Sequence, residues 1–191
     1  FFLLPIVLTV SHRMIPFFSS RVLENYDMVR PFWMLWLMLA CIAAHGLLQC
    51  FELTGYLWLV DFPLAACALY LSYRWQLQRS FQVSLLAVLH ISFAWFGVAM
   101  VLYAVQSLVY LASGNLILGL APLHALGIGF FSGMILAMAS RVTLGHSGRP
   151  LELDRFTWLL FLGFQATAVI RILADLIPAI APMFYVLAAL V

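Results

Sequence analysis

The stretch that decides the fold is VSLLAVLHISFAWFGVAMVLYAVQSLVYL, residues 83–111. It contains no charged side chain, and it is longer than the ~20 residues that an α-helix needs to cross a ~30 Å hydrocarbon layer. Its one imidazole, His90, lies inside an otherwise apolar run. An uncharged stretch of this length predicts a transmembrane helix.

The rest of the chain has the same character. It is 66% hydrophobic and 8% charged, whereas a soluble domain carries about 25% charged residues. Apolar runs of spanning length also occur at 32–51, 56–74, 117–140 and 156–177. Residues 1–11 and 182–191 are apolar but too short to cross, so we expect two truncated spans. The fold class expected is therefore all-α, a polytopic transmembrane bundle with five full spans and two truncated ones.

No tandem repeat or soluble domain interrupts the spans. We therefore expect residues 1–191 to form a single transmembrane helical domain. No basic region precedes the first apolar run, so a secretory signal peptide is a poor interpretation of the start. The truncated ends favour a fragment of a larger polytopic protein.

The arginines predict the orientation of the bundle. Eight of the nine lie in or beside three connections: 12–31, 74–82 and 141–155. The opposite connections, at 52–56, 112–117 and 178–182, contain none. Because short basic loops stay cytoplasmic, the three arginine-rich connections are expected inside. These side chains face anionic membrane lipid, and with a net charge of +2 we expect no nucleic-acid partner.

Four histidines lie in or at the ends of apolar runs: His12, His45, His90 and His124. An imidazole at membrane depth needs a hydrogen-bonding neighbour, a proton path, or a metal or haem iron. At 1.5 Å per residue, His45 and His124 lie ~10 Å below the outer boundary, whereas His90 and His12 fall in the inner half. Two layers of histidine allow two cofactor sites, or one site and one structural histidine.

Helix 117–140 carries a stripe of small residues at every fourth position: Ala121, Ala125, Gly129, Gly133 and Ala137. Such a stripe lets another helix, or a flat cofactor, approach closely, and helix packing is the simpler interpretation. His124 lies beside the stripe, close to its outer end.

The block RVTLGHSGRP, residues 141–150, follows that helix. We interpret it as a cytoplasmic loop in which two glycines permit tight turns around His146, between Arg141 and Arg149. Such a loop suits an anion or haem propionates, and it also suits an ordinary helix-joining turn.

A second candidate face lies on the 32–51 span. Met34, Met38, Cys41 and His45 share one side of the helix, and thioether and thiolate groups beside an imidazole suit copper(I). Packing is the alternative for this stripe.

Charged residues inside the spans suggest a different class of protein. Arg171 and Asp175 are spaced i, i+4, and Asp61 lies at a similar depth, so together they suit a substrate or proton path of a transporter. A structural ion pair is the simpler interpretation of Arg171 and Asp175. A structural subunit of a respiratory membrane complex is a third possibility.

Two blocks of the sequence resemble the signature of the NnrS family: residues 124–138 and residues 141–150. Three shorter pieces, 13–18, 89–95 and 171–173, fit the same pattern in the same order. The resemblance implies a multi-pass bacterial inner-membrane protein of about twelve helices, associated with haem, copper and resistance to nitric oxide. It further implies that this chain is the C-terminal half, with the N-terminal half missing.

By this resemblance, a haem iron held by membrane histidines binds nitric oxide or a nitrosyl species within the bilayer. His124 is the first choice of axial ligand, followed by His90 and His45. The further cofactor contacts expected are His12, Arg13, Arg141, His146 and Arg149. No motif places copper ligands, and enzymatic turnover stays open because no electron-donor site or catalytic acid is recognisable.

Overall fold

A computed structural model describes residues 2–148, 152–177 and 181–190, and every regular element in these ranges is helical. The elements are α1 (Leu3–Val22), α2 (Phe32–Cys50), η1 (Thr54–Tyr56), α3 (Trp58–Arg74), α4 (Leu77–Ser80), α5 (Ser84–Ser113), α6 (Ala121–His124), η2 (Ala125–Ser132), α7 (Gly133–His146), α8 (Arg155–Leu176) and α9 (Ala181–Leu190). The predicted all-α, multi-pass membrane bundle is confirmed.

Within the described ranges, five helices are long and apolar enough to cross a membrane. They are α1, α2, α5, the continuous α6–η2–α7 helix, and α8. Two segments of the chain differ from the expectation. The first apolar run is part of a full span rather than a truncated one, and the 56–74 segment forms α3, whose 17 residues lie at the short end of the range for a span.

The expected connection beginning at residue 12 is wrong, because α1 continues to Val22. The buried positions of α1 recur at helical spacing: Leu4, Leu8, Ser11, His12, Ile15, Pro16 and Ser19. Three of these buried residues, Ser11, His12 and Ser19, are polar, so hydropathy alone ends the apolar run before the helix ends. Pro16 does not end the helix, because neighbouring groups in a bundle can satisfy the freed backbone carbonyl.

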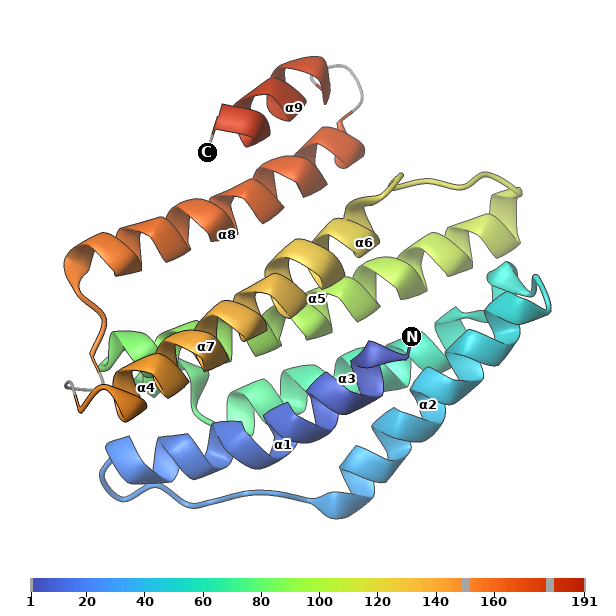
Figure 1. The fold of residues 1–191 in the computed structure, drawn as a ribbon. Helices are drawn as coiled ribbons and strands as arrows, with labels where there is room; N and C mark the ends of the chain where they lie inside the picture. The colour runs from blue at the N-terminus through green and yellow to red at the C-terminus, as the bar shows by residue number, and fades with distance from the viewer. Residues whose placement is uncertain (1, 149–151, 178–180, 191) are drawn as a thin grey trace.

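Helix α5 is the centre of the bundle (Figure 1), lying between α3 and the α6–η2–α7 helix. Helix α8 packs against α6 and η2 from the other side, and α9 packs on α8. Four fully buried aromatic rings join the C-terminal end of α3 to α5 and η2: Trp75, directly after α3, and Phe93, Phe96 and Phe130, with successive centroids 4.8, 6.2 and 5.3 Å apart. These contacts fix the positions of the packed helices relative to one another along the axis of the bundle.

The arginine-bearing connections lie at one end of the bundle. Figure 1 shows the ends of α1, α3 and α7 and the starts of α2, α5 and α8 at that end, and the ends of α2, α5 and α8 and the starts of α3, α6 and α9 at the other. This arrangement agrees with the predicted alternation of the spans. That the arginine end faces the cytoplasm stays a prediction.

The small-residue stripe faces α5. A Cβ atom on Gly129 would lie 2.5 Å from Cγ of Trp95, and one on Gly133 would lie 2.6 Å from Oγ of Ser92. Ala121, Ala125 and Ala137 are fully buried on the same face. The stripe therefore serves helix packing, and Trp95 and Ser92 fill the space that a flat cofactor would need.

Candidate histidine–aspartate sites

The histidine at the start of the α6–η2–α7 helix contacts the last turn of α8. Nδ1 of His124 donates to Oδ2 of Asp175 over 2.9 Å. The His124 side chain is 18% exposed and that of Asp175 is 7% exposed, so the ring keeps an accessible edge while the carboxylate is enclosed. Pro122 suits the first turn of this helix, where its missing N–H is not needed.

The carboxylate of Asp175 lies against the backbone of Gly119. This glycine has φ +46°, and a Cβ atom on it would lie 3.1 Å from Oδ1 of Asp175. Glycine is favoured here for two reasons, the left-handed backbone and the close approach of the carboxylate. The α5–α6 connection thus helps to orient Asp175 toward His124.

A second histidine–aspartate pair joins α2 to α3. Nδ1 of His45 donates to Oδ1 of Asp61 over 2.6 Å, and the two side chains are 1% and 0% exposed. The ring of Tyr103 on α5 meets the His45 ring edge-on, with centroids 5.6 Å apart. This pair is enclosed by three helices, in contrast to the partly accessible His124 pair.

Both pairs use the same ring nitrogen. A carboxylate that accepts from Nδ1 keeps the proton on that atom and the lone pair on Nε2, which is the usual arrangement around histidines that ligate metals. His45 and His124 both lie near the end opposite the arginines, as predicted. Because α5 runs between α2–α3 and α6–α8, the pairs form two separate sites (Figure 1).

The inner histidines have different surroundings. Nε2 of His90 lies 2.9 Å from Oγ of Ser19, whose own proton goes to the carbonyl of Ile15. Nε2 of His90 therefore already has a hydrogen-bond partner on α1. The His12 ring packs between Phe32 and Trp75, with centroids 6.0 and 5.9 Å away, and is 1% exposed. The ligand roles expected of His90 and His12 stay predictions.

The predicted loop cradle is wrong for its first six residues, because α7 extends through His146. Arg141 is buried on this helix, with its guanidinium carbon 3.6 Å from the centroid of the Phe18 ring. His146 is exposed, and Arg13 is exposed on α1. Arg149 lies outside the described residues. Residues 141–146 continue the helix rather than form a loop, because the first residue after α7 with a left-handed backbone is Gly148.

The face proposed for copper is confirmed as a shared face, since Met34, Met38, Cys41 and His45 are all buried. In the part of the chain that the structure describes, however, no group of three or more His, Cys, Asp and Glu side chains could hold a metal. Copper binding on this face stays a prediction.

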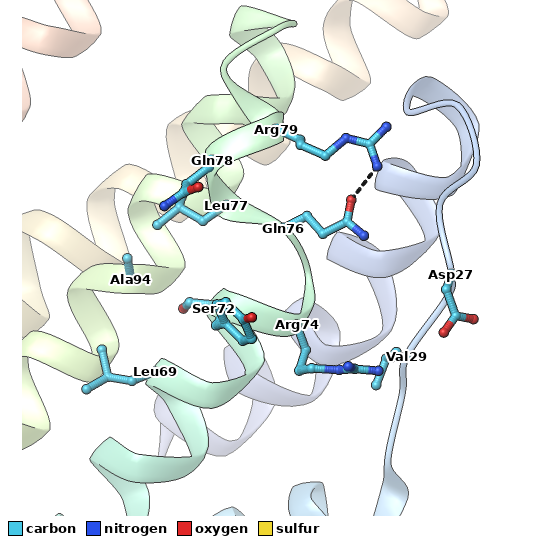
Figure 2. A pocket seen from close by; sticks show the side chains of 11 residues that line it. Asp27, Val29, Leu69, Ser72, Arg74, Gln76, Leu77, Gln78, Arg79 and Ala94 are labelled. Atoms are coloured by element: carbon cyan, nitrogen blue, oxygen red, sulfur yellow. Dashed lines mark hydrogen bonds between the residues drawn. The ribbon is translucent and has the colours of Figure 1, made fainter.

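A cavity of about 570 Å³ with both polar and apolar walls lies at the arginine end, between α3, α4, α5 and the segment after α1. Figure 2 shows Arg79 and Gln76 on its wall, joined by a 2.7 Å hydrogen bond. Arg79 also donates to the carbonyl of Glu24 over 2.7 Å, which ties the α1–α2 segment to α4. No candidate cofactor ligand is among its lining residues, so this cavity is separate from the histidine sites.

Sequence reasoning missed the aspartate partners of the two histidines. The sequence suggests a charged path of Asp61, Arg171 and Asp175, but the structure places the two aspartates on different helix pairs. A signal for the first pair exists in the sequence. His45 and Asp61 lie at similar distances on either side of the α2–α3 connection, so antiparallel packing brings them to one depth.

The comparisons with known proteins agree with this architecture. The sequence profile described as NnrS protein matches residues 1–191, the whole chain. No curated protein and no solved structure matches it. The chain therefore belongs to the NnrS family of multi-pass membrane proteins.

Proposed function

We propose that this protein binds haem in the bacterial inner membrane and takes part in the response to nitric oxide. The observation that carries the proposal is the Nδ1–carboxylate hydrogen bond of His124, repeated at His45. In each pair the aspartate presents Nε2 as the coordinating atom, which is what an axial haem ligand requires.

His124 is the preferred ligand, since its ring edge is accessible from outside the core whereas His45 is enclosed. It is followed at once by the π-helical turn Ala125–Ser132, and π-helical turns are frequent at functional sites. The donor chemistry also fits haem, because haem iron takes one or two protein ligands and each pair supplies one imidazole.

Iron in a bound haem would supply the affinity for nitric oxide, an apolar gas that partitions into the bilayer. The residues of this chain do the positioning. Asp175 holds the His124 ring and its tautomer, and Gly119 lets Asp175 approach. Arg141 lies ~25 Å from His124 along one helix, so the expected propionate contact from Arg141 does not serve a haem at His124.

The experiment is optical absorption of the purified protein after reconstitution with haem. His124→Ala should remove or strongly shift the Soret band, while membrane insertion is retained because one imidazole adds little to the apolar area. His146→Ala is the matched control, since this exposed histidine lies on the same helix but at the other end. An unchanged Soret band for His124→Ala, with a lost band for His90→Ala or His12→Ala, would place the cofactor in the inner layer instead.

A further inference from the structure

A groove runs along the outward face of α1 at the arginine end of the bundle. It consists of two adjoining cavities of about 610 and 360 Å³, and Met14 and Phe17 line both. The first cavity also contacts Arg30, on the segment before α2, and the second contacts α7. We call this combined surface the α1 groove.

The α1 groove carries four guanidinium groups and no carboxylate. Arg13 and Arg30 line the first cavity, and Arg21 and Arg141 line the second. Among the residues that the structure describes, none of these four arginines forms a salt bridge. The groove is therefore a strongly positive surface without an internal counter-charge.

The burial of Arg141 in the wall of the α1 groove leads us to expect a bound anion beside its guanidinium. Arg141 is 8% exposed and its guanidinium lies over the Phe18 ring, so little of its surface contacts bulk water except through the groove. A charge that is buried without a partner is strongly destabilising. A guanidinium held in this way offers its donor fork to a phosphate, which it can bind through two parallel hydrogen bonds.

The remaining walls are apolar, mainly Val10, Met14, Phe17, Met138 and Val142. A small inorganic anion would leave these walls uncovered, whereas a phospholipid matches both parts of the groove. We propose that the α1 groove binds an anionic phospholipid of the arginine-side leaflet. One phosphate lies between Arg13 and Arg30, another lies between Arg21 and Arg141, and the acyl chains cover the apolar walls. Basic pockets between transmembrane helices bind such headgroups.

The test is native mass spectrometry of the delipidated protein in detergent, titrated with three lipids. These are diphosphatidylglycerol, phosphatidylglycerol and zwitterionic phosphatidylethanolamine. We expect one tight adduct of diphosphatidylglycerol, up to two weaker adducts of phosphatidylglycerol, and no saturable adduct of phosphatidylethanolamine. Equal affinity for all three lipids would overturn the proposal.

Variants locate the site. Arg21→Gln with Arg141→Gln, and separately Arg13→Gln with Arg30→Gln, should each weaken diphosphatidylglycerol binding, by about fivefold for each arginine removed. Arg141→Lys should keep part of the affinity, because it keeps the charge but loses the fork. The control is Arg155→Gln, an exposed arginine at the same end and outside the groove.

Two results would contradict the assignment. One is equal lipid affinity in the groove variants and in Arg155→Gln. The other is a loss of the Soret band in the groove variants with unchanged lipid binding, which would make the groove a propionate site. The Arg13 and Arg30 variant keeps the test decisive if replacement of the buried Arg141 impairs folding.

Discussion

Asp175 accepts a hydrogen bond from Nδ1 of His124 over 2.9 Å, although the two residues belong to different spans, α8 and α6. The same contact joins His45 to Asp61. A carboxylate in this position holds the orientation and the tautomer of the imidazole.

The first prediction concerns the carboxylate behind the expected ligand. Asp175→Asn should weaken haem binding by about 10–100-fold and raise the haem reduction potential, because the ring loses its anionic partner. Haem titration and a spectroscopic redox titration measure the two effects. A simple structural role for Asp175 would lower thermal stability without moving the potential.

A second prediction concerns the enclosed pair. His45→Ala should lower the free energy of unfolding by about 3–5 kcal/mol, because Asp61 is then buried without its imidazole partner. The double variant His45→Ala, Asp61→Ala should lose less than His45→Ala alone. Thermal unfolding in detergent provides the comparison, and additive losses would show that the pair is not coupled.

Glycine substitutions test the packing of the stripe. Gly129→Ala should destabilise the bundle by about 1–3 kcal/mol, since its methyl group would collide with the Trp95 ring. Gly127→Ala is the matched control in the same π-helical segment, because nothing lies within 4 Å of its Cβ position. If both variants melt at the same temperature, the contact between Gly129 and Trp95 is not important for stability.

The orientation can be tested with single cysteines in a cysteine-free background. Gln78, Ser147 and Asn115 are all exposed, the first two at the arginine end and the third at the opposite end. In intact cells, cysteines at 78 and 147 should be protected from an impermeant thiol reagent, whereas one at 115 should be labelled. The reverse pattern would invert the predicted topology.

The start of α8 should respond to pH. The amide of Thr157 donates to Oδ1 of Asp154 over 3.3 Å, and hydrogen bonding with Thr157 holds the pKa of Asp154 below its usual value. The cap therefore stabilises the helix above the unfolded pKa, and this contribution is lost as pH falls through the lower folded pKa. Melting curves between neutral and acidic pH should show this loss. Asp154→Asn keeps a capping oxygen but does not titrate, so this variant should not show the loss of stability at acidic pH.

The fold class could be predicted because it depends on local composition. An uncharged run such as residues 83–111 has few stable places other than a bilayer, and the arginine pattern then orders the ends of the spans. The prediction that residues 12–22 belong to a connection is wrong for a related reason. Averaged hydropathy does not record which face of a helix the polar residues occupy, whereas burial in α1 follows one face.

The sequence by itself determined that histidines lie at membrane depth, that two of them lie toward each end, and that the chain resembles the NnrS family. Only the tertiary structure decided which groups they contact. The partner of His124 comes from α8 and that of His90 from α1, and neither contact follows from spacing along one helix. These partners depend on how α5 spaces and rotates its neighbours, and that arrangement is set by packing between helices, such as Trp95 against Gly129.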